Sequence, residues 1–181
     1  MTRERVVITG LGMFCGVGKD IAEFSDALCT GRCGIQPLDL FDVSPFPSKI
    51  ASEIKGYDPL DHFDRRAARR LSRSDQFGVI AAGEALRDSG AAGSYSPYEM
   101  GVSMGGGAAG MFQGEVWLKG FLEGRAGHPS LLRGILPDQT STDIARTTIW
   151  AGIRARSRPP VHPRRQPSAG RPTWWPAVVS D

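Results

Sequence analysis

The chain has 181 residues, of which 40% are hydrophobic and 23% charged, a balance that excludes both a disordered and a membrane-embedded protein. This length favours one domain with a sizeable core over two domains. The net charge of +3 is uneven: residues 1–150 carry −2, whereas residues 151–181 carry six arginines and one aspartate, or +5, so the basic charge indicates no nucleic-acid partner for the folded part.

The start of the chain offers no targeting or membrane-spanning segment. Three charged residues precede only three apolar ones, Val6 to Ile8, before Thr9 and Gly10. A signal-peptide core or a membrane span needs a much longer apolar run. We therefore expect a cytoplasmic protein without a membrane partner.

Strand and helix signals alternate through the first part of the chain. Residues 5–9 are a β-branched run closed by glycines, the pattern of a buried strand that feeds a turn. Asp20 then begins a helix with apolar residues at spacings of three and four, which Gly31 ends. Residues 34–48 are loop-like and rich in proline, and residues 49–54 alternate as a short strand.

Two helices are expected in the middle of the chain. The first covers residues 64–73 and is strongly basic, with Arg65, Arg66, Arg69, Arg70 and Arg73. Its arginines form either a solvated helix face or a docking surface for an acidic carrier protein. The second helix covers residues 76–86 and is stopped by Gly90. Apolar residues nearly encircle it, so we expect it to be buried.

The same alternation continues beyond this helix. Residues 99–104 are expected to form a buried strand, which runs into the glycine-rich turn 105–110 and a helix that ends near Gly120. Residues 131–137 are expected to form a loop, and residues 140–143 offer the N-cap of a further helix. This order of elements is typical of an α/β protein whose sheet faces are covered.

The composition changes abruptly near residue 150. From Ala151 onward the chain is rich in arginine and proline, and it contains neither lysine nor glutamate. The prolines prevent helix and sheet interiors, so we expect a disordered tail. We therefore divide the chain into residues 1–148, the structured part, and residues 149–181, the tail.

A nucleotide-binding interpretation rests on one glycine-rich turn. Gly105, Gly107 and Gly110 match the dinucleotide spacing between an expected strand and an expected helix. The acidic residue that should close a second strand about 20 residues later is missing. Tight turns and close packing of a helix on a strand explain these glycines better, and no cofactor is expected. A nucleotide-dependent oxidoreductase remains the weakest of the functional alternatives.

No catalytic or metal-binding group can be assembled from the residues present. The three histidines are His62, His128 and His162, none of which neighbours a nucleophile in the sequence. The three cysteines, an odd number, are expected to be reduced thiols, and Cys29 with Cys33 provides too few ligands for structural zinc. We therefore assign no catalytic, cofactor-binding or metal-binding residue.

Beyond these individual signals, the ordered motifs resemble condensing β-ketoacyl synthases of the fatty-acid and polyketide type. The matching segments keep the same order and spacing over most of the chain. They are Val6–Met13, Gly16–Gly18, Gly31–Ile35, Phe41–Phe46, Asp75–Phe77, Ala85–Gly90, Met100–Gly107 and Leu136–Ala145. The resemblance implies a thiolase-like αβαβα fold, of which residues 1–148 would be an incomplete half. It also implies a homodimer or heterodimer that uses acyl carrier protein as its partner.

The reaction implied by the resemblance is the decarboxylative Claisen condensation of an acyl thioester with malonyl-acyl carrier protein. The family uses a cysteine and two later histidines for it. This chain has no cysteine after Cys33, and residues 147–160 replace the expected cysteine turn with an arginine- and proline-rich segment. We therefore expect a ketosynthase fragment that is inactive alone, with a frameshift near residues 146–153.

The alternative from another functional class is a non-catalytic interaction module that pairs with an intact ketosynthase or an acyl carrier protein. In either case residues 6–8 and 100–104 would lack part of their covering. Each large apolar side chain left exposed forfeits about 1.5–3 kcal/mol. We therefore expect the isolated chain to be a molten or aggregating product.

Overall fold

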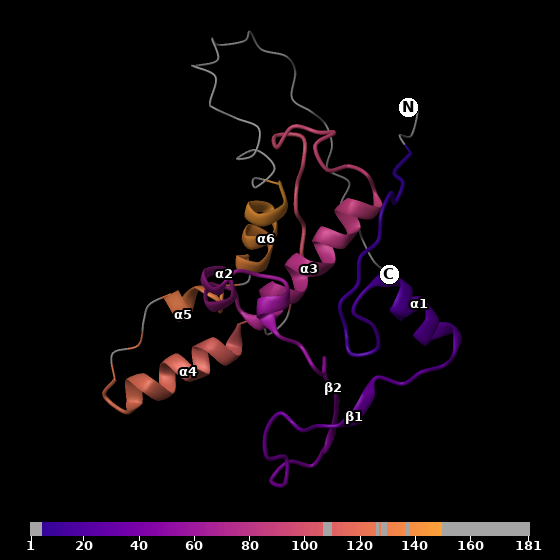
Figure 1. Ribbon diagram of the computed structural model, residues 1–181. Helices are drawn as coiled ribbons and strands as arrows, with labels where there is room; N and C mark the ends of the chain where they lie inside the picture. Colours follow the sequence, from indigo (N-terminus) through magenta and orange to yellow (C-terminus); the bar gives the residue numbers. More distant parts are fainter. Residues whose placement is uncertain (1–4, 107–109, 126, 128–129, 137, 150–181) are drawn as a thin grey trace, which may run out of the picture.

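The computed structural model describes residues 5–106, 110–125, 127, 130–136 and 138–149. Helix α3 (Arg73–Asp88) lies at the centre, with α6 (Gln139–Ile144) packed beside it. Helices α1 (Ile21–Cys29) and α4 (Met111–Leu122) lie on opposite sides of α3 (Figure 1). The remaining elements are short: β1 (Ile35–Pro37), β2 (Ile50–Ser52), η1 (Pro59–Asp61), α2 (Arg65–Arg70), α5 (Ser130–Arg133) and η2 (Ala145–Ile149).

The first helix begins and ends where its local signals predict. Asp20 is the N-cap of α1, and its carboxylate accepts a hydrogen bond of 2.7 Å from the backbone N–H of Glu23. After the helix, Gly31 adopts a φ of 68°, a left-handed conformation that glycine reaches without a steric penalty. Both signals are local in sequence, and the prediction of this helix is confirmed.

The basic helix ends earlier than predicted. The expected helix 64–73 stops at Arg70, because Ser72 begins a separate helix, α3. The Ser72 hydroxyl accepts a hydrogen bond from the backbone N–H of Asp75, and the Asp75 carboxylate accepts one from Ser72 N–H, both at 3.1 Å. This reciprocal capping box directs the chain into α3 and places Arg73 in its first turn.

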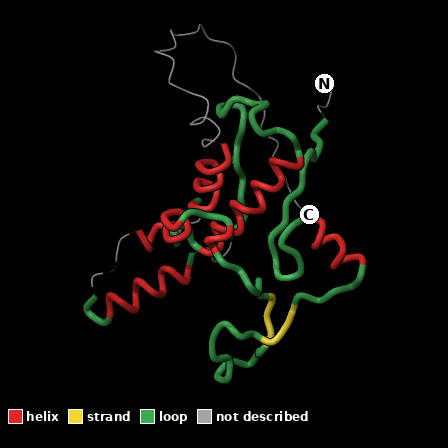
Figure 2. Tube along the Cα trace, viewed as in Figure 1, coloured by secondary structure: helices red, strands yellow, loops and turns green. Residues whose placement is uncertain are grey.

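Two of the three strands expected from the sequence are not formed. The strand prediction is confirmed only for residues 49–54, which contain β2. In the described part of the chain, β2 pairs with β1 in antiparallel fashion (Figure 2). Residues 5–9 and 99–104 are outside any strand, and Val6 is 90% exposed. A buried strand needs hydrogen-bonded neighbours and a helix on each face, and the described residues provide neither for these segments.

The buried core of the described residues is small and contains six polar or charged residues beside five apolar ones. Its apolar members are Phe14, Ala27, Leu71, Val79 and Ile144, and its polar members are Ser72, Asp75, Gln76, Gln139, Thr140 and Asp143. The expectation that α3 would be buried is therefore wrong over most of its length. Only three α3 residues are buried, all in its first half, because α6 covers that half of the helix.

Two further predictions need correction in the second half of the chain. Residues 131–137 were expected to be a loop, but α5 takes up part of this segment and packs on α4. Helix α6 begins at Gln139 with Asp138 as its N-cap, before the expected cap at residues 140–143. The predicted tail 149–181 lies outside the described residues, Ile149 excepted. No helix in the described part is long and apolar enough to span a membrane.

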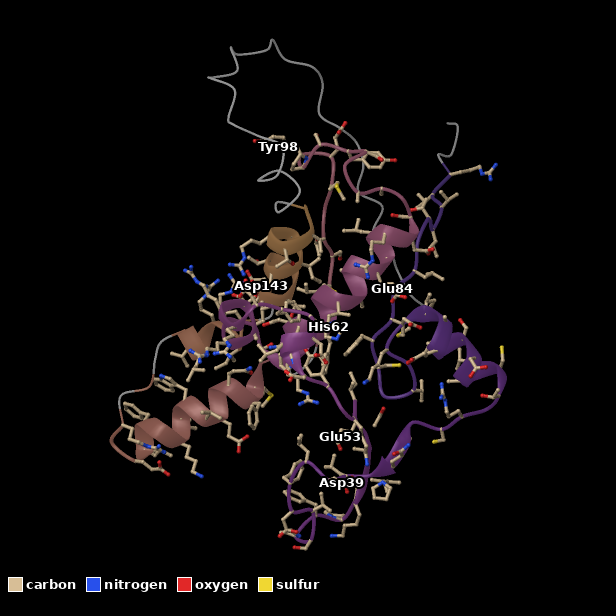
Figure 3. The ribbon with its side chains drawn as sticks, viewed as in Figure 1. Asp39, Glu53, His62, Glu84, Tyr98 and Asp143 are labelled. Atoms are coloured by element: carbon tan, nitrogen blue, oxygen red, sulfur yellow. The ribbon has the colours of Figure 1, made fainter. Side chains whose placement is uncertain are left out.

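Acidic side chains of α3 hold the N-terminal segment. The Glu84 carboxylate accepts hydrogen bonds from the backbone N–H groups of Met13 at 2.8 Å and Ile21 at 2.9 Å. The carboxylate of Asp88 accepts a third, from the N–H of Leu11, at 2.9 Å. Glu84 projects from α3 toward the N-terminal segment (Figure 3). Two acidic residues one helical turn apart therefore position residues 11–21.

Replacing Glu84 should release this segment locally. In Glu84→Ala, the amides of Met13 and Ile21 lose an ionised acceptor, and hydrogen bonds to charged groups contribute about 1.5–3 kcal/mol each. We expect hydrogen exchange at these two amides to accelerate by about tenfold or more. Glu115→Ala, at an exposed position of α4, is the matched control and should leave the exchange unchanged. Equal exchange in Glu84→Ala and the unmodified chain would contradict this role.

Candidate functional site

The most strongly charged surface of the described residues lies on α2. We call Arg65, Arg66, Arg69 and Arg70 the α2 arginine surface; all four side chains are exposed. The ion pairs among described residues are Lys55–Asp39, Arg125–Glu123 and Arg146–Asp143. The four guanidinium groups of α2 therefore have no carboxylate partner in the described structure. Such a surface attracts an acidic partner.

A cavity of about 350 Å³ lies beside this surface, between α2 and α4. Its walls are mainly apolar, with two arginines at its border. The lining residues are Tyr57, Pro59, Ala68, Arg69, Leu71, Arg73, Gln76, Phe112, Gln113, Val116 and Leu131. Positive charge beside an apolar hollow can accommodate a partner that is both acidic and apolar.

An aromatic cluster joins the segment before α2 to helix α3. The ring of Tyr57 packs on Phe77 of α3 with centroids 5.0 Å apart, and on Phe14 with centroids 5.6 Å apart. His62 stacks on Tyr57 at 5.8 Å, and Figure 3 shows His62 near the junction of α2 and α3. Aromatic pairs at these distances contribute beyond their buried area. The cluster therefore fixes the segment that leads into α2.

Arg73 differs from the arginines of α2. Its guanidinium carbon lies 5.5 Å from the ring centroids of both Tyr57 and Phe77, a cation–π geometry. One of its nitrogens also donates a hydrogen bond of 3.2 Å to the carbonyl of Ile54. Arg73 is thus occupied by contacts within the chain. Of the five arginines that the sequence grouped together, the other four have no ion pair among the described residues.

Gln76 links the aromatic cluster to the end of α2. The Tyr57 hydroxyl donates a hydrogen bond of 2.7 Å to the side-chain oxygen of Gln76. The Gln76 amide nitrogen in turn donates to the carbonyls of Ala68 at 2.9 Å and Leu71 at 3.3 Å. Gln76 is only 4% exposed, so its amide is satisfied by partners within the protein. This network sets the position of α2 on α3.

A second polar network joins α3 to α6. The buried carboxylate of Asp75 accepts a hydrogen bond of 2.5 Å from the Thr140 hydroxyl. On α6, Gln139 donates to Asp143 at 2.6 Å, and Arg146 pairs with the same carboxylate. Asp143 lies on the α6 ribbon in Figure 3. Gly78 allows the close approach, because a Cβ at this position would lie 2.9 Å from Thr140 Cγ2.

The candidate nucleophiles of the sequence are not brought together. Cys15 is half-buried in a tight turn, where its backbone exchanges hydrogen bonds with Gly18, and Cys29 and Cys33 are exposed free thiols. His62 belongs to the aromatic cluster, whereas His128 and His162 lie outside the described residues. Among the described residues, no group of three or more His, Cys, Asp or Glu side chains could hold a metal ion.

The glycine-rich turn has a packing role at its end. Gly110 adopts a φ of 71° at the N-terminus of α4, and a Cβ there would lie 1.6 Å from the carbonyl oxygen of Gly134. Any side chain at residue 110 would therefore separate α4 from α5. Gly107 of the same motif lies outside the described residues.

The sequence matches the family described as β-ketoacyl synthase, N-terminal domain, over residues 3–158. The chain therefore belongs to the β-ketoacyl synthase family. It is 43% identical over 110 residues to the β-ketoacyl synthase 1 assigned to the granaticin polyketide in Streptomyces violaceoruber. It is 36% identical over 112 residues to 3-oxoacyl-[acyl-carrier-protein] synthase 2 of Coxiella burnetii. These matches cover 60% and 61% of this chain but only 26% and 27% of the relatives, so it spans about a quarter of their length.

Solved structures give the same family. The ishigamide ketosynthase/chain length factor matches with a TM-score of 0.63 and 28% identity, over 80% of this chain and 37% of that one. A ketosynthase of a type II polyketide system, solved with its acyl carrier protein, shares the fold with a TM-score of 0.51 and 16% identity, over 80% and 39% of the two chains. The described residues therefore form part of a ketosynthase fold. The relatives act in fatty-acid and polyketide synthesis.

The titration of Tyr57 tests the aromatic cluster. Burial raises the pKa of Tyr57 from 10.0 to about 12, against the opposing effect of the nearby Arg73 charge. Because the folded pKa lies above the unfolded one, the neutral phenol stabilises the fold below pH 10, and this contribution is lost as the pH rises to about 12. In Tyr57→Phe we expect the phenolate absorbance step near pH 12 to disappear. A step of unchanged amplitude would contradict this assignment.

Proposed function

We propose that this chain is the N-terminal part of a β-ketoacyl synthase whose reaction is the decarboxylative Claisen condensation of an acyl thioester with malonyl-acyl carrier protein. The observation that carries the proposal is the family match over residues 3–158, with 3-oxoacyl-[acyl-carrier-protein] and polyketide synthases among the relatives. The fold likeness over 80% of the chain supports it. In the full reaction an acylated thiol and preorganised hydrogen-bond donors would do the chemistry.

Within this proposal, the 181-residue chain does not catalyse condensation alone. Its three cysteines all lie within the first 33 residues, and all three are free thiols. We propose that residues 1–148 are the ketosynthase part and that residues 149–181 are an out-of-frame tail. Translating the coding DNA with a one-base shift near codons 146–153 should then recover a glycine-rich turn and a cysteine.

Incubation with acyl- and malonyl-carrier protein tests the catalytic part of the proposal. The isolated chain should give neither a condensed product nor an acylated thiol detectable by intact-protein mass spectrometry. An intact β-ketoacyl synthase in a parallel reaction is the positive control. Acylation of Cys15, Cys29 or Cys33 in stoichiometric amount, followed by condensation, would overturn the assignment of inactivity.

We also propose that the α2 arginine surface docks the acidic face of acyl carrier protein. The four guanidinium groups have no carboxylate partner in the described structure, and an apolar cavity lies beside them. Opposite charges on two surfaces accelerate association and set orientation. The sequence alone is compatible with either a solvated helix face or a docking surface. The pairing of Arg73 inside the chain, with the other four arginines free, favours docking.

Charge reversal on this surface should weaken carrier-protein binding. In the double variant Arg66→Glu, Arg70→Glu, two attractions become repulsions, and we expect affinity for acyl carrier protein to fall by about tenfold or more. The residual binding should depend less on salt than that of the unmodified chain. Lys119→Glu changes an exposed cation on α4 and is the matched control. If calorimetry finds the same affinity in both variants, the α2 arginine surface is not the docking site for acyl carrier protein.

The second candidate function is a non-catalytic interaction module. The same arginine surface favours it, because docking needs charge complementarity and no catalytic cysteine. The two candidates differ in one observation. Carrier protein binds the 181-residue chain in either case. An interaction module also binds an intact ketosynthase as the 181-residue chain, whereas a fragment of the enzyme gains condensation when the family sequence is restored.

A further inference from the structure

Helix α2 depends on one side chain of α3 at its C-terminal end. In a continuous helix the carbonyl of Ala68 would accept the N–H of Ser72, but that N–H is bound to the Asp75 carboxylate in the capping box of α3. The amide nitrogen of Gln76 takes its place, at 2.9 Å from the Ala68 carbonyl oxygen, and also reaches that of Leu71 at 3.3 Å. A six-residue helix is not stable by itself in water, so this contact holds α2 in place.

The Gln76 side chain is itself fixed by its neighbours. Its oxygen accepts a hydrogen bond of 2.7 Å from the Tyr57 hydroxyl, and this bond leaves the amide nitrogen directed at α2. The Tyr57 ring packs on Phe77 and lies under the Arg73 guanidinium, whose carbon is 5.5 Å from the ring centroid. Gln76 is only 4% exposed, and its amide hydrogens and oxygen are all used within the chain. Any effect of this amide on a partner therefore passes through the residues that it holds.

The same side chain borders the apolar cavity beside the α2 arginine surface. Ala68 and Leu71, whose carbonyls Gln76 binds, line this cavity together with Gln76 and Tyr57. Arg69 belongs both to the cavity lining and to the arginine surface. One buried amide thus connects the helix that carries the positive charge with the wall of the apolar hollow.

We propose that Gln76 is a positioning residue for the docking of acyl carrier protein. It holds the four arginines of α2 at a fixed distance and angle from the apolar cavity, so that an acidic face and an apolar group of one partner meet both at once. This inference rests on the docking function proposed for the α2 arginine surface. Charge attracts a partner from a distance, whereas a rigid arrangement of contacts determines how slowly the partner leaves.

Gln76→Leu tests this role without a change of charge. It removes the amide but keeps a side chain of similar size, so α2 loses its anchor and retains all its arginines. In surface plasmon resonance we expect the dissociation rate constant for acyl carrier protein to rise about fivefold or more, and the association rate constant to stay within about twofold of that of the unmodified chain. The charge reversal Arg66→Glu, Arg70→Glu should instead lower the association rate constant. This difference separates positioning from attraction.

Gln76→Glu makes the same test reversible in one sample. An ionised carboxylate cannot donate to the carbonyls of Ala68 and Leu71, whereas a protonated carboxyl group restores one donor. A buried carboxyl group has a pKa above its ordinary value of about 4.3, so the donor is absent at high pH and returns as the pH falls. We expect the affinity of this variant, relative to that of the unmodified chain, to be lowest at about pH 9 and to recover toward about pH 5.

Taking the ratio to the unmodified chain at each pH removes the titration of the carrier protein and of the groups that both chains share. The charged or titratable side chains around residue 76 are Tyr57, His62, Arg69, Arg73 and Asp75. The matched control is Gln36→Leu, at an exposed position of β1, which should leave both rate constants unchanged. Far-UV circular dichroism should show that all variants keep their helices.

The outcomes distinguish this inference from the docking function. If the charge reversal weakens binding but Gln76→Leu leaves the dissociation rate constant unchanged, Gln76 is not a positioning residue and the docking function stands. If the unmodified chain does not bind acyl carrier protein, the docking function fails and this inference fails with it. A ratio for Gln76→Glu that does not change with pH would also contradict the role. So would loss of the helical signal in both Gln76 variants at every pH, because Gln76 would then maintain the whole fold.

Discussion

The described fold depends on carboxylates of α3 that accept hydrogen bonds from distant parts of the chain. Asp75 binds the Thr140 hydroxyl of α6, Glu84 binds two backbone amides of the N-terminal segment, and Asp88 binds a third. These contacts join residues separated by 63 to 77 positions. A backbone amide that has no sheet partner must find another acceptor, and an ionised carboxylate is the strongest one available. Helix α3 thus holds both the N-terminal segment and α6.

This arrangement changes what stabilises the structure. Burial of a large apolar side chain contributes about 1.5–3 kcal/mol, and a hydrogen bond to a charged group contributes a similar amount. The core holds only five buried apolar residues, one of them an alanine, so the polar anchors on α3 matter as much as packing. The apolar residues around α4, such as Phe112 at 72% and Leu122 at 76% exposure, contribute little to this core. In most domains, substitutions reduce stability most where they disturb packing. Here they should reduce it most where they remove a hydrogen bond.

The features predicted correctly from the sequence are those whose causes are local. Asp20 and Gly31 set the ends of α1 through contacts within a few residues, and glycine at residue 90 has the positive φ expected after α3. Residues 5–9 have the composition of a strand, but a strand exists only when another backbone pairs with it. The cap at Ser72 lies before the predicted start of the second helix at residue 76 and inside the segment predicted as the first helix.

The features of the candidate site also divide into those with local causes and those that depend on tertiary contact. Charge spacing in the sequence is enough to find the α2 arginine surface, since residues 65–70 form one short helix. The inward role of Arg73 and the cluster around Tyr57 depend on residues from three separate segments, 14, 57–62 and 73–77, and no sequence pattern joins them. The link from Gln76 to two carbonyls near the end of α2 likewise depends on tertiary contact.

The positive charge of α2 follows from how nearby aspartates are used. Asp58 accepts from the Leu60 amide at the start of η1, Asp64 accepts from the Ala67 amide at the start of α2, and Asp75 is buried against Thr140. Three of the four aspartates between residues 58 and 75 are therefore directed at backbone amides or into the core rather than at guanidinium groups. Carboxylates at helix N-termini stabilise the helices that carry the arginines. Because these carboxylates are used within the chain, none of them pairs with the arginines of α2, and the positive surface is a direct consequence of the fold.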